Sequence, residues 1–134
     1  MAAIFEKLNW KDQQEIVVLN APDSFEPELA QVSASTIIRS LSPMKETKFL
    51  LSFVTRKSEV DALASQIAKR AKGDAIVWFA YPKGSSKKYK CDFNRDTGWD
   101  AMTGLGFETV RAVSIDEDWT ALRFRRSEYV KQRN

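Results

Sequence analysis

The sequence predicts one α/β domain with a mainly parallel sheet, and three observations support this prediction. Two continuous apolar segments, KFLLSFVT (48–55) and DAIVWFAY (74–81), are typical of buried strands. Between them, apolar residues recur with helical spacing from Val60 to Ala71. Near the C-terminus, two short alternating segments are typical of an antiparallel hairpin.

The N-terminal third is expected to add to the same sheet. Residues 3–9 predict a short lead-in helix, EIVVLN (15–20) a buried strand, and STIIRS (35–40) a second strand. Between these strands, Ala21-Pro22-Asp23-Ser24 ends the first strand and can cap a short helix that holds Phe25 and Leu29.

The strand–helix–strand unit over 48–81 sets the direction of the sheet. Ser58 and Asp61 resemble a capping box at the start of the helix, and Gly73 is expected to end it. A helix of this length between two strands forms a right-handed crossover, so the two strands should be parallel.

The remaining segments complete the prediction. A polar loop, PKGSSKKYKC (82–91), precedes a short helix within 94–104 that starts near Asn94 or Thr97. The segments FETVRAVSI (107–115) and WTALRFR (119–125) are separated by too few residues for a parallel crossover, so they should pair as an antiparallel edge hairpin. Residues 1–134 therefore predict a small Rossmann-like three-layer sandwich with helices on both faces.

Composition excludes several kinds of function. The 134 residues are 43% hydrophobic and 29% charged, as in ordinary globular proteins, and no apolar run reaches the roughly 20 residues that a membrane helix needs. The first residues lack a basic region followed by an apolar one, so we expect a cytoplasmic protein. The chain has one cysteine, Cys91, and no histidine, which excludes an internal disulfide and removes the commonest general base and metal ligand. We therefore predict no metal site and assign no catalytic residue.

The loop after residue 81 provides the candidate ligand site. Ligands bind beyond the carboxyl ends of the strands in open α/β sheets, and both this loop and the turn after the first strand should lie there. Basic side chains and exposed N–H groups suit a phosphate or a carboxylate. The predicted anion-binding residues are Lys83, Gly84, Ser85, Ser86, Arg95, Asp96 and Thr97. The alternative is a solvated loop tip and a local helix cap.

The C-terminal hairpin provides a candidate interaction surface. Trp119, Arg123 and Arg125 could contact a protein or RNA along an exposed strand, although packing in the core or at its rim is the other interpretation of Trp119. The acidic residues 116–118 are interpreted as a solvated turn.

The second half of the chain resembles a family of uncharacterised bacterial domains that has no established activity. The resemblance lies in three motifs of this sequence, YPKGSS (81–86), RDTGW (95–99) and DEDWTALRF (116–124), with Thr120 where the family usually has Ser. The segments EKL (6–8) and VLNAPDSF (18–25) are similar more loosely. The resemblance implies a fold and no activity.

The predicted architecture also resembles the later half of class I methyltransferases, which hold S-adenosylmethionine on a glycine-rich turn after their first strand. In this chain the corresponding turn, residues 20–24, contains no glycine, so we predict no cofactor. The leading hypothesis is a non-catalytic or weakly ligand-binding module for a small anionic metabolite or nucleotide. The alternatives are a degenerate or divergent methyltransferase-like enzyme that uses Asp96 or Asp23, and a protein- or RNA-interaction module.

We expect a small anionic ligand as partner, with a protein partner or a homodimer as open alternatives, and no membrane. The net charge of +3 does not favour nucleic acid.

Overall fold

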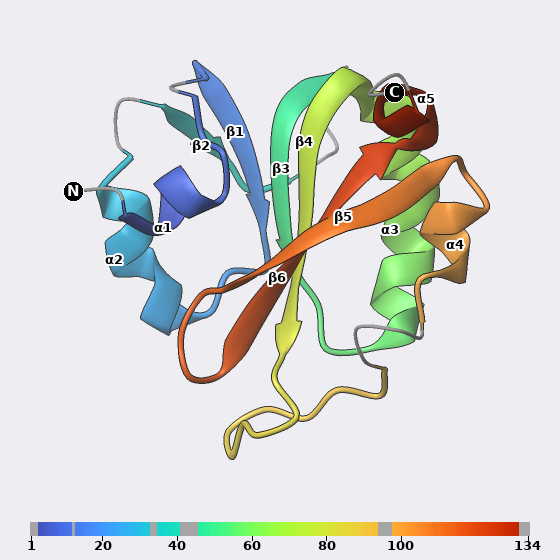
Figure 1. The fold of residues 1–134 in the computed structure, drawn as a ribbon. Helices are drawn as coiled ribbons and strands as arrows, with labels where there is room; N and C mark the ends of the chain where they lie inside the picture. The colour runs from blue at the N-terminus through green and yellow to red at the C-terminus, as the bar shows by residue number, and fades with distance from the viewer. Residues whose placement is uncertain (1–2, 12, 33–34, 41–45, 94–97, 132–134) are drawn as a thin grey trace.

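A computed structural model describes residues 3–11, 13–32, 35–40, 46–93 and 98–131 of the chain. Among these residues, a six-stranded mixed sheet has the order β2-β1-β3-β4-β6-β5 (Figure 1). The elements in chain order are α1 (Ala3–Lys7), β1 (Glu15–Leu19), the 3₁₀ helix η1 (Asp23–Phe25), α2 (Glu26–Ala30), β2 (Thr36–Ile38), β3 (Thr47–Phe53), α3 (Lys57–Arg70), β4 (Ala71–Pro82), α4 (Asp100–Thr103), β5 (Phe107–Ser114), β6 (Trp119–Arg126) and α5 (Ser127–Lys131).

Four parallel strands form the centre and one side of the sheet. β1 pairs with both β2 and β3, and β3 pairs with β4 through Leu50 opposite Val77 and Ser52 opposite Phe79. The α3 crossover between β3 and β4 is the unit that the sequence predicts, and the parallel direction of its two strands is confirmed.

The C-terminal strands reverse the direction of the sheet. β6 runs antiparallel to β4, with Trp119 opposite Pro82, and β5 pairs with β6 on its outer side. The predicted hairpin is therefore confirmed, with β5 as the edge strand and β6 between two neighbours.

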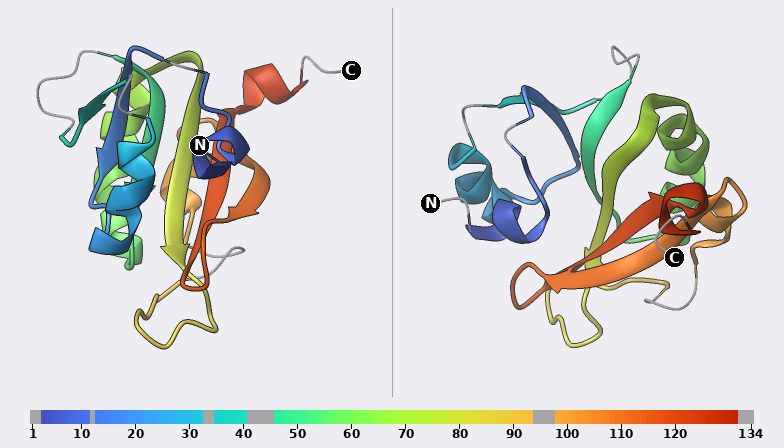
Figure 2. Two further views of the ribbon diagram at one scale, coloured as in Figure 1. Left: turned by 90° about the vertical axis from the view of Figure 1, so that its left-hand side faces the viewer. Right: turned by 45° about the horizontal axis from the view of Figure 1, so that its top comes forward.

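Helices cover both faces of the sheet, as predicted (Figures 1 and 2). On one face, α1 with the following Leu8, η1 and α2 pack through Phe5, Leu8, Phe25 and Leu29 against buried side chains of β1 and β3. On the other face, α3 and α4 pack through a second cluster that includes Ile67 and Met102. Alternate residues along each buried strand supply the two clusters, because successive strand side chains point to opposite faces.

Between β1 and β3, the order in which strands are added to the sheet reverses. From β1 the chain passes through α2 to β2 on one side, whereas from β3 it passes through α3 to β4 on the other side. The helices that follow β1 and β3 therefore lie on opposite faces, and the chain leaves the paired carboxyl ends of these two strands in opposite directions (Figure 1).

The boundaries of α3 differ from the prediction. Ser58 and Asp61 form no capping box: the helix begins at Lys57, and Glu59 Oε1 accepts hydrogen bonds from the backbone N–H groups of Thr55 (2.7 Å) and Arg56 (3.0 Å). The helix ends at Arg70, three residues before Gly73, and the chain enters β4 at Ala71. Gly73, at φ +58°, lies inside the strand, where its left-handed conformation changes the course of the chain.

One other helix prediction needs correction, and one helix was not predicted. The helix expected within 94–104 is only the four residues of α4, which begin at Asp100, and the predicted starts at Asn94 and Thr97 lie outside the described residues. No pattern in residues 127–131 predicts α5, which follows β6 directly. Within the described part of the chain, no helix is long and apolar enough to cross a membrane.

Arg126 closes the carboxyl end of α3. Its Nη2 donates to the carbonyl oxygens of Ala68 (2.8 Å) and Ala71 (2.7 Å), and its guanidinium lies 4.7 Å from the centre of the Phe107 ring. These contacts connect the last strand to the central crossover, because they satisfy carbonyl groups that a helix end leaves without partners.

We predict that Arg126→Met lowers the free energy of unfolding by about 2 kcal/mol, because the charged donor is lost while most of the apolar stem is kept. The matched control is Arg125→Met. Arg125 makes a two-point ion pair with Asp74 at 2.7–2.8 Å on the surface, so its loss should lower stability by no more than about 1 kcal/mol. Urea unfolding measures both, and equal losses would contradict the assignment.

Candidate functional site

A cleft of about 480 Å³ lies at the carboxyl ends of β1 and β3, where the segments that follow the two strands lead to opposite faces of the sheet. Its lining comes from four parts of the chain: the turn after β1, the end of β3 with the start of α3, the loop after β4, and the start of β6. The lining residues are Asn20, Ala21, Pro22, Asp23, Ser24, Phe53, Thr55, Glu59, Lys88, Tyr89 and Trp119. This is the place at which open α/β sheets bind ligands.

The turn after β1 forms one wall of the cleft. Asn20 adopts a left-handed conformation at φ +59°, which asparagine tolerates better than most side chains. The chain then turns through Ala21 and Pro22 into η1, where Phe25 N–H donates to the Pro22 carbonyl (2.9 Å). Phe25 is 2% exposed, so its burial fixes the turn against the sheet.

Three aromatic side chains form the opposite wall. The Phe53 ring lies 5.1 Å from the Trp119 ring in an edge-to-face arrangement, and the Tyr89 ring lies 4.9 Å from Trp119. Phe53 also packs against Phe25 at 4.9 Å, which supports the wall from behind. Phe53 and Trp119 are buried and Tyr89 is half-buried, so Tyr89 is the most accessible of the three rings.

The indole N–H of Trp119 has no hydrogen-bond partner among the described residues, although the side chain is only 3% exposed. A buried donor without an acceptor costs about 1–3 kcal/mol, and such groups are rare in native proteins. Two other indole groups do have acceptors: Trp10 donates to Ser35 (3.0 Å) and Trp78 to the Leu8 carbonyl (2.8 Å). Trp119 lines the cleft, and its buried N–H is a donor that a bound acceptor would satisfy on reaching it.

The polar residues of the cleft differ in how far they are already engaged. Thr55 donates from both its backbone N–H (2.7 Å) and its hydroxyl (3.2 Å) to Glu59, so this carboxylate is held in the cap of α3. Asn20, Asp23 and Lys88 are exposed at the rim.

The loop predicted as an anion site is fastened to the C-terminal hairpin. Lys83 Nζ donates to Ser114 Oγ (2.7 Å), and its backbone N–H donates to the Asp118 carbonyl (2.8 Å). Ser86 Oγ donates to Asp118 Oδ1 (2.9 Å) and accepts from Tyr89 N–H (3.1 Å). Lys83, Gly84 and Ser86 also line a second hollow of about 370 Å³, whereas Ser85 lies in a third with Glu117 and Asp118.

The other predicted site residues lie in different surroundings. Arg95, Asp96 and Thr97 are outside the described residues, so their predicted role in anion binding stays a prediction. Trp119 is buried, and Arg123 and Arg125 are half-buried on β6, which is an inner strand. The proposed interaction surface therefore does not coincide with the exposed edge, which belongs to β5.

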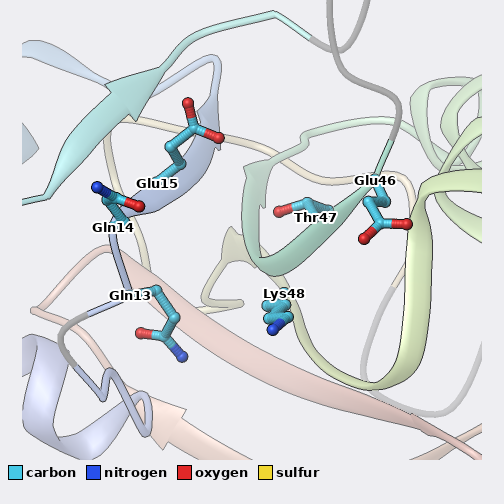
Figure 3. Close-up of a pocket in the computed structure, with 6 residues that line it drawn as sticks. All are labelled: Gln13, Gln14, Glu15, Glu46, Thr47 and Lys48. Atoms are coloured by element: carbon cyan, nitrogen blue, oxygen red, sulfur yellow. The ribbon is translucent and has the colours of Figure 1, made fainter.

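Another hollow, of about 380 Å³, lies at the amino edge of the sheet (Figure 3). Polar side chains at the starts of β1 and β3 line it, including Glu15, Glu46 and Lys48, and they point in different directions. Because α/β sheets bind ligands at the carboxyl edge, the cleft at Trp119 is the stronger candidate.

The sequence predicts two of the cleft's loops and points to Trp119, but not to the aromatic wall that Trp119 forms with Phe53 and Tyr89. The turn after β1 and the loop after β4 do meet at one edge, as the parallel topology predicts. Phe53, Thr55 and Tyr89 were not singled out. Their position could have been inferred from the same rule, because Phe53 and Thr55 lie where β3 ends.

Solved structures of methyltransferases share this fold. A SAM-dependent methyltransferase from Aquifex aeolicus superimposes with a TM-score of 0.65 at 8% identity, over 92% of this chain and 87% of that one. The Methanococcus jannaschii fibrillarin pre-rRNA processing protein gives 0.55 at 10% identity, over 87% and 67%. A putative type 11 methyltransferase from Sulfolobus solfataricus gives 0.53 at 8% identity, over 94% and 89%. The chain therefore has a methyltransferase-like Rossmann fold.

No family model and no curated protein matches the sequence. The resemblance to uncharacterised bacterial domains therefore stays a prediction.

We predict that Ser86→Ala lowers the free energy of unfolding by about 1 kcal/mol and increases the mobility of Tyr89, because the hydroxyl connects the loop to Asp118. Ser85→Ala is the matched control, since Ser85 is exposed. Chemical unfolding and the amide exchange rate of Tyr89 check both variants. Equal behaviour of the two would show that Ser86 does not fasten the loop.

Cys91 should react slowly with alkylating reagents. The thiol is half-buried beside the second hollow, and burial is the main cause that raises its pKa, with Asp92 and Glu59 raising it further against an opposing backbone hydrogen bond at Phe93. Because the thiolate is the reactive form, less of it is present at pH 8 than in an unperturbed thiol. The rate of iodoacetamide alkylation should therefore rise at a higher pH than it does for a free cysteine peptide. An earlier rise would contradict this prediction and indicate an activated thiol.

Proposed function

We propose that this chain is a divergent methyltransferase-like domain that binds a small molecule in the strand-edge cleft and does not transfer methyl groups. The observation that carries the proposal is the buried indole N–H of Trp119, which has no acceptor among the described residues and belongs to a residue that lines the cleft. Cleft and donor together form a site that a ligand would complete.

The likeness to SAM-dependent enzymes raises the question whether S-adenosylmethionine fits this chain. Glycines after the first strand of nucleotide-binding sheets allow the backbone to approach the cofactor closely, and free N–H groups there bind its polar atoms. Here the turn is Asn20-Ala21-Pro22-Asp23-Ser24. Each of these residues carries a side chain, and Pro22 has no N–H to donate.

The end of β2 is also unsuited to a nucleoside cofactor. In dinucleotide-binding sheets an acidic residue about 20 positions beyond the glycine turn binds the ribose hydroxyls. In this chain Arg39 occupies that region, directly after β2, and its guanidinium makes a two-point ion pair with Glu26 of α2 (both contacts 2.9 Å). The residues present therefore do not fit S-adenosylmethionine, which supports binding without methyl transfer.

The proposal predicts that ligands of the cleft perturb one indole signal selectively. In a ¹⁵N–¹H spectrum, the indole resonance of Trp119 should move when a library of small molecules is added, because its N–H gains an acceptor. The indole of Trp10 is the internal control, since it already donates to Ser35 and does not line the cleft.

Two variants keep the test independent of folding defects. Trp119→Phe removes the donor and keeps an aromatic ring, and Tyr89→Leu alters the half-buried ring on the loop. Both should weaken binding at least about tenfold, measured by titration calorimetry because Trp119→Phe lacks the indole signal. Perturbation of other residues only, or no perturbation of Trp119 by any compound, would contradict the proposed function.

A further inference from the structure

We infer that the cleft selects an uncharged planar heteroaromatic ring with a hydrogen-bond acceptor, and discriminates against the anionic form of the same molecule. This inference rests on the proposed function and adds the class of ligand. It departs from the anionic ligand that the sequence predicts for the neighbouring loop.

The need for an acceptor follows from the chemistry of Trp119. An indole N–H can only donate, so a ligand that satisfies it must present a lone pair, such as a ring nitrogen or an amide oxygen. No acceptor among the described residues forms a hydrogen bond with the Trp119 N–H. The Trp119 N–H is already shielded from water in the free protein, because the side chain is buried. A ligand therefore does not have to displace water from this donor.

The preference for a planar ring follows from the aromatic wall. Phe53 is held between Phe25 and Trp119 at ring distances of 4.9 and 5.1 Å, so its position is fixed by packing on two sides. Tyr89 is half-buried and belongs to the loop, so its ring can cover a flat ligand. Offset and edge-to-face contacts with these rings favour an aromatic guest over an aliphatic one.

The preference for an uncharged ligand follows from the charges around the cleft. Two carboxylates, those of Asp23 and Glu59, line it together with one lysine, Lys88. Glu59 is held by Thr55 and Arg56 and remains an acceptor-only group. Lys88 also lines the adjoining hollow, where with Lys87 it balances Glu117 and Asp118, so that this hollow adds no net charge of its own. Among the charged side chains that line the cleft itself, the two carboxylates outnumber the one lysine, and an anion entering the cleft meets repulsion.

A matched pair of probes tests the inference: nicotinamide and nicotinate share a pyridine ring and differ in charge. Titrations are followed through the Trp119 indole resonance. We expect nicotinamide to bind at least about fivefold more tightly than nicotinate at pH 7 and low salt. Asp23→Asn should reduce this ratio, whereas Lys88→Ala should increase it. Both substitutions lie on exposed rim residues, so the fold should tolerate them.

The outcomes separate this inference from the proposed function. Equal or tighter binding of nicotinate, or a ratio that Asp23→Asn leaves unchanged, would overturn the preference for an uncharged ring while leaving a ligand in the cleft. If neither probe moves the Trp119 signal and other library compounds do, the ligand class is wrong and the site stands. If no compound moves it, both proposals fail.

Discussion

The parallel pairing of β1 and β3 is the constraint on which the rest of the structure depends. Because the chain leaves these neighbouring strands toward opposite faces of the sheet, their carboxyl ends cannot be covered by one helix. The cleft lies between the turn at Asn20 and the end of β3 at Phe53, where the segments after the two strands separate. The same constraint places α2 and α3 on different faces, each over its own apolar cluster. The cleft is thus a consequence of topology before any side chain is considered.

The antiparallel pairing of β6 with β4 brings Trp119 to the cleft. Since β6 runs against β4, its first residue, Trp119, lies opposite the last residue of β4, Pro82, at the carboxyl edge of the sheet. The loop that follows β4 is fastened to the turn before β6 through Ser86 and Asp118, which brings Tyr89 onto Trp119. An aromatic wall therefore forms from segments that are distant in the sequence.

Much of the fold could be predicted from the sequence because local patterns were consistent with one another. Apolar runs identified β3 and β4, helical spacing identified α3, and the short connection after Ser114 identified the hairpin. The cap of α3 was mispredicted because Ser58 has a typical capping side chain, whereas the contact that forms uses Glu59 and the backbone before it. Gly73 predicts a helix end because glycine favours positive φ; it does adopt positive φ, but inside β4.

The candidate site was harder to predict, because it depends on a hydrogen bond that is absent among the described residues. No sequence pattern reveals that Trp10 and Trp78 find acceptors while Trp119 does not; this follows only from packing. The fold is methyltransferase-like, yet the turn after β1 and Arg39 after β2 do not suit a nucleoside cofactor. Titration calorimetry with S-adenosylmethionine tests this separation of fold from cofactor most directly. We expect no saturable heat at millimolar cofactor; a saturable one-to-one isotherm would contradict it.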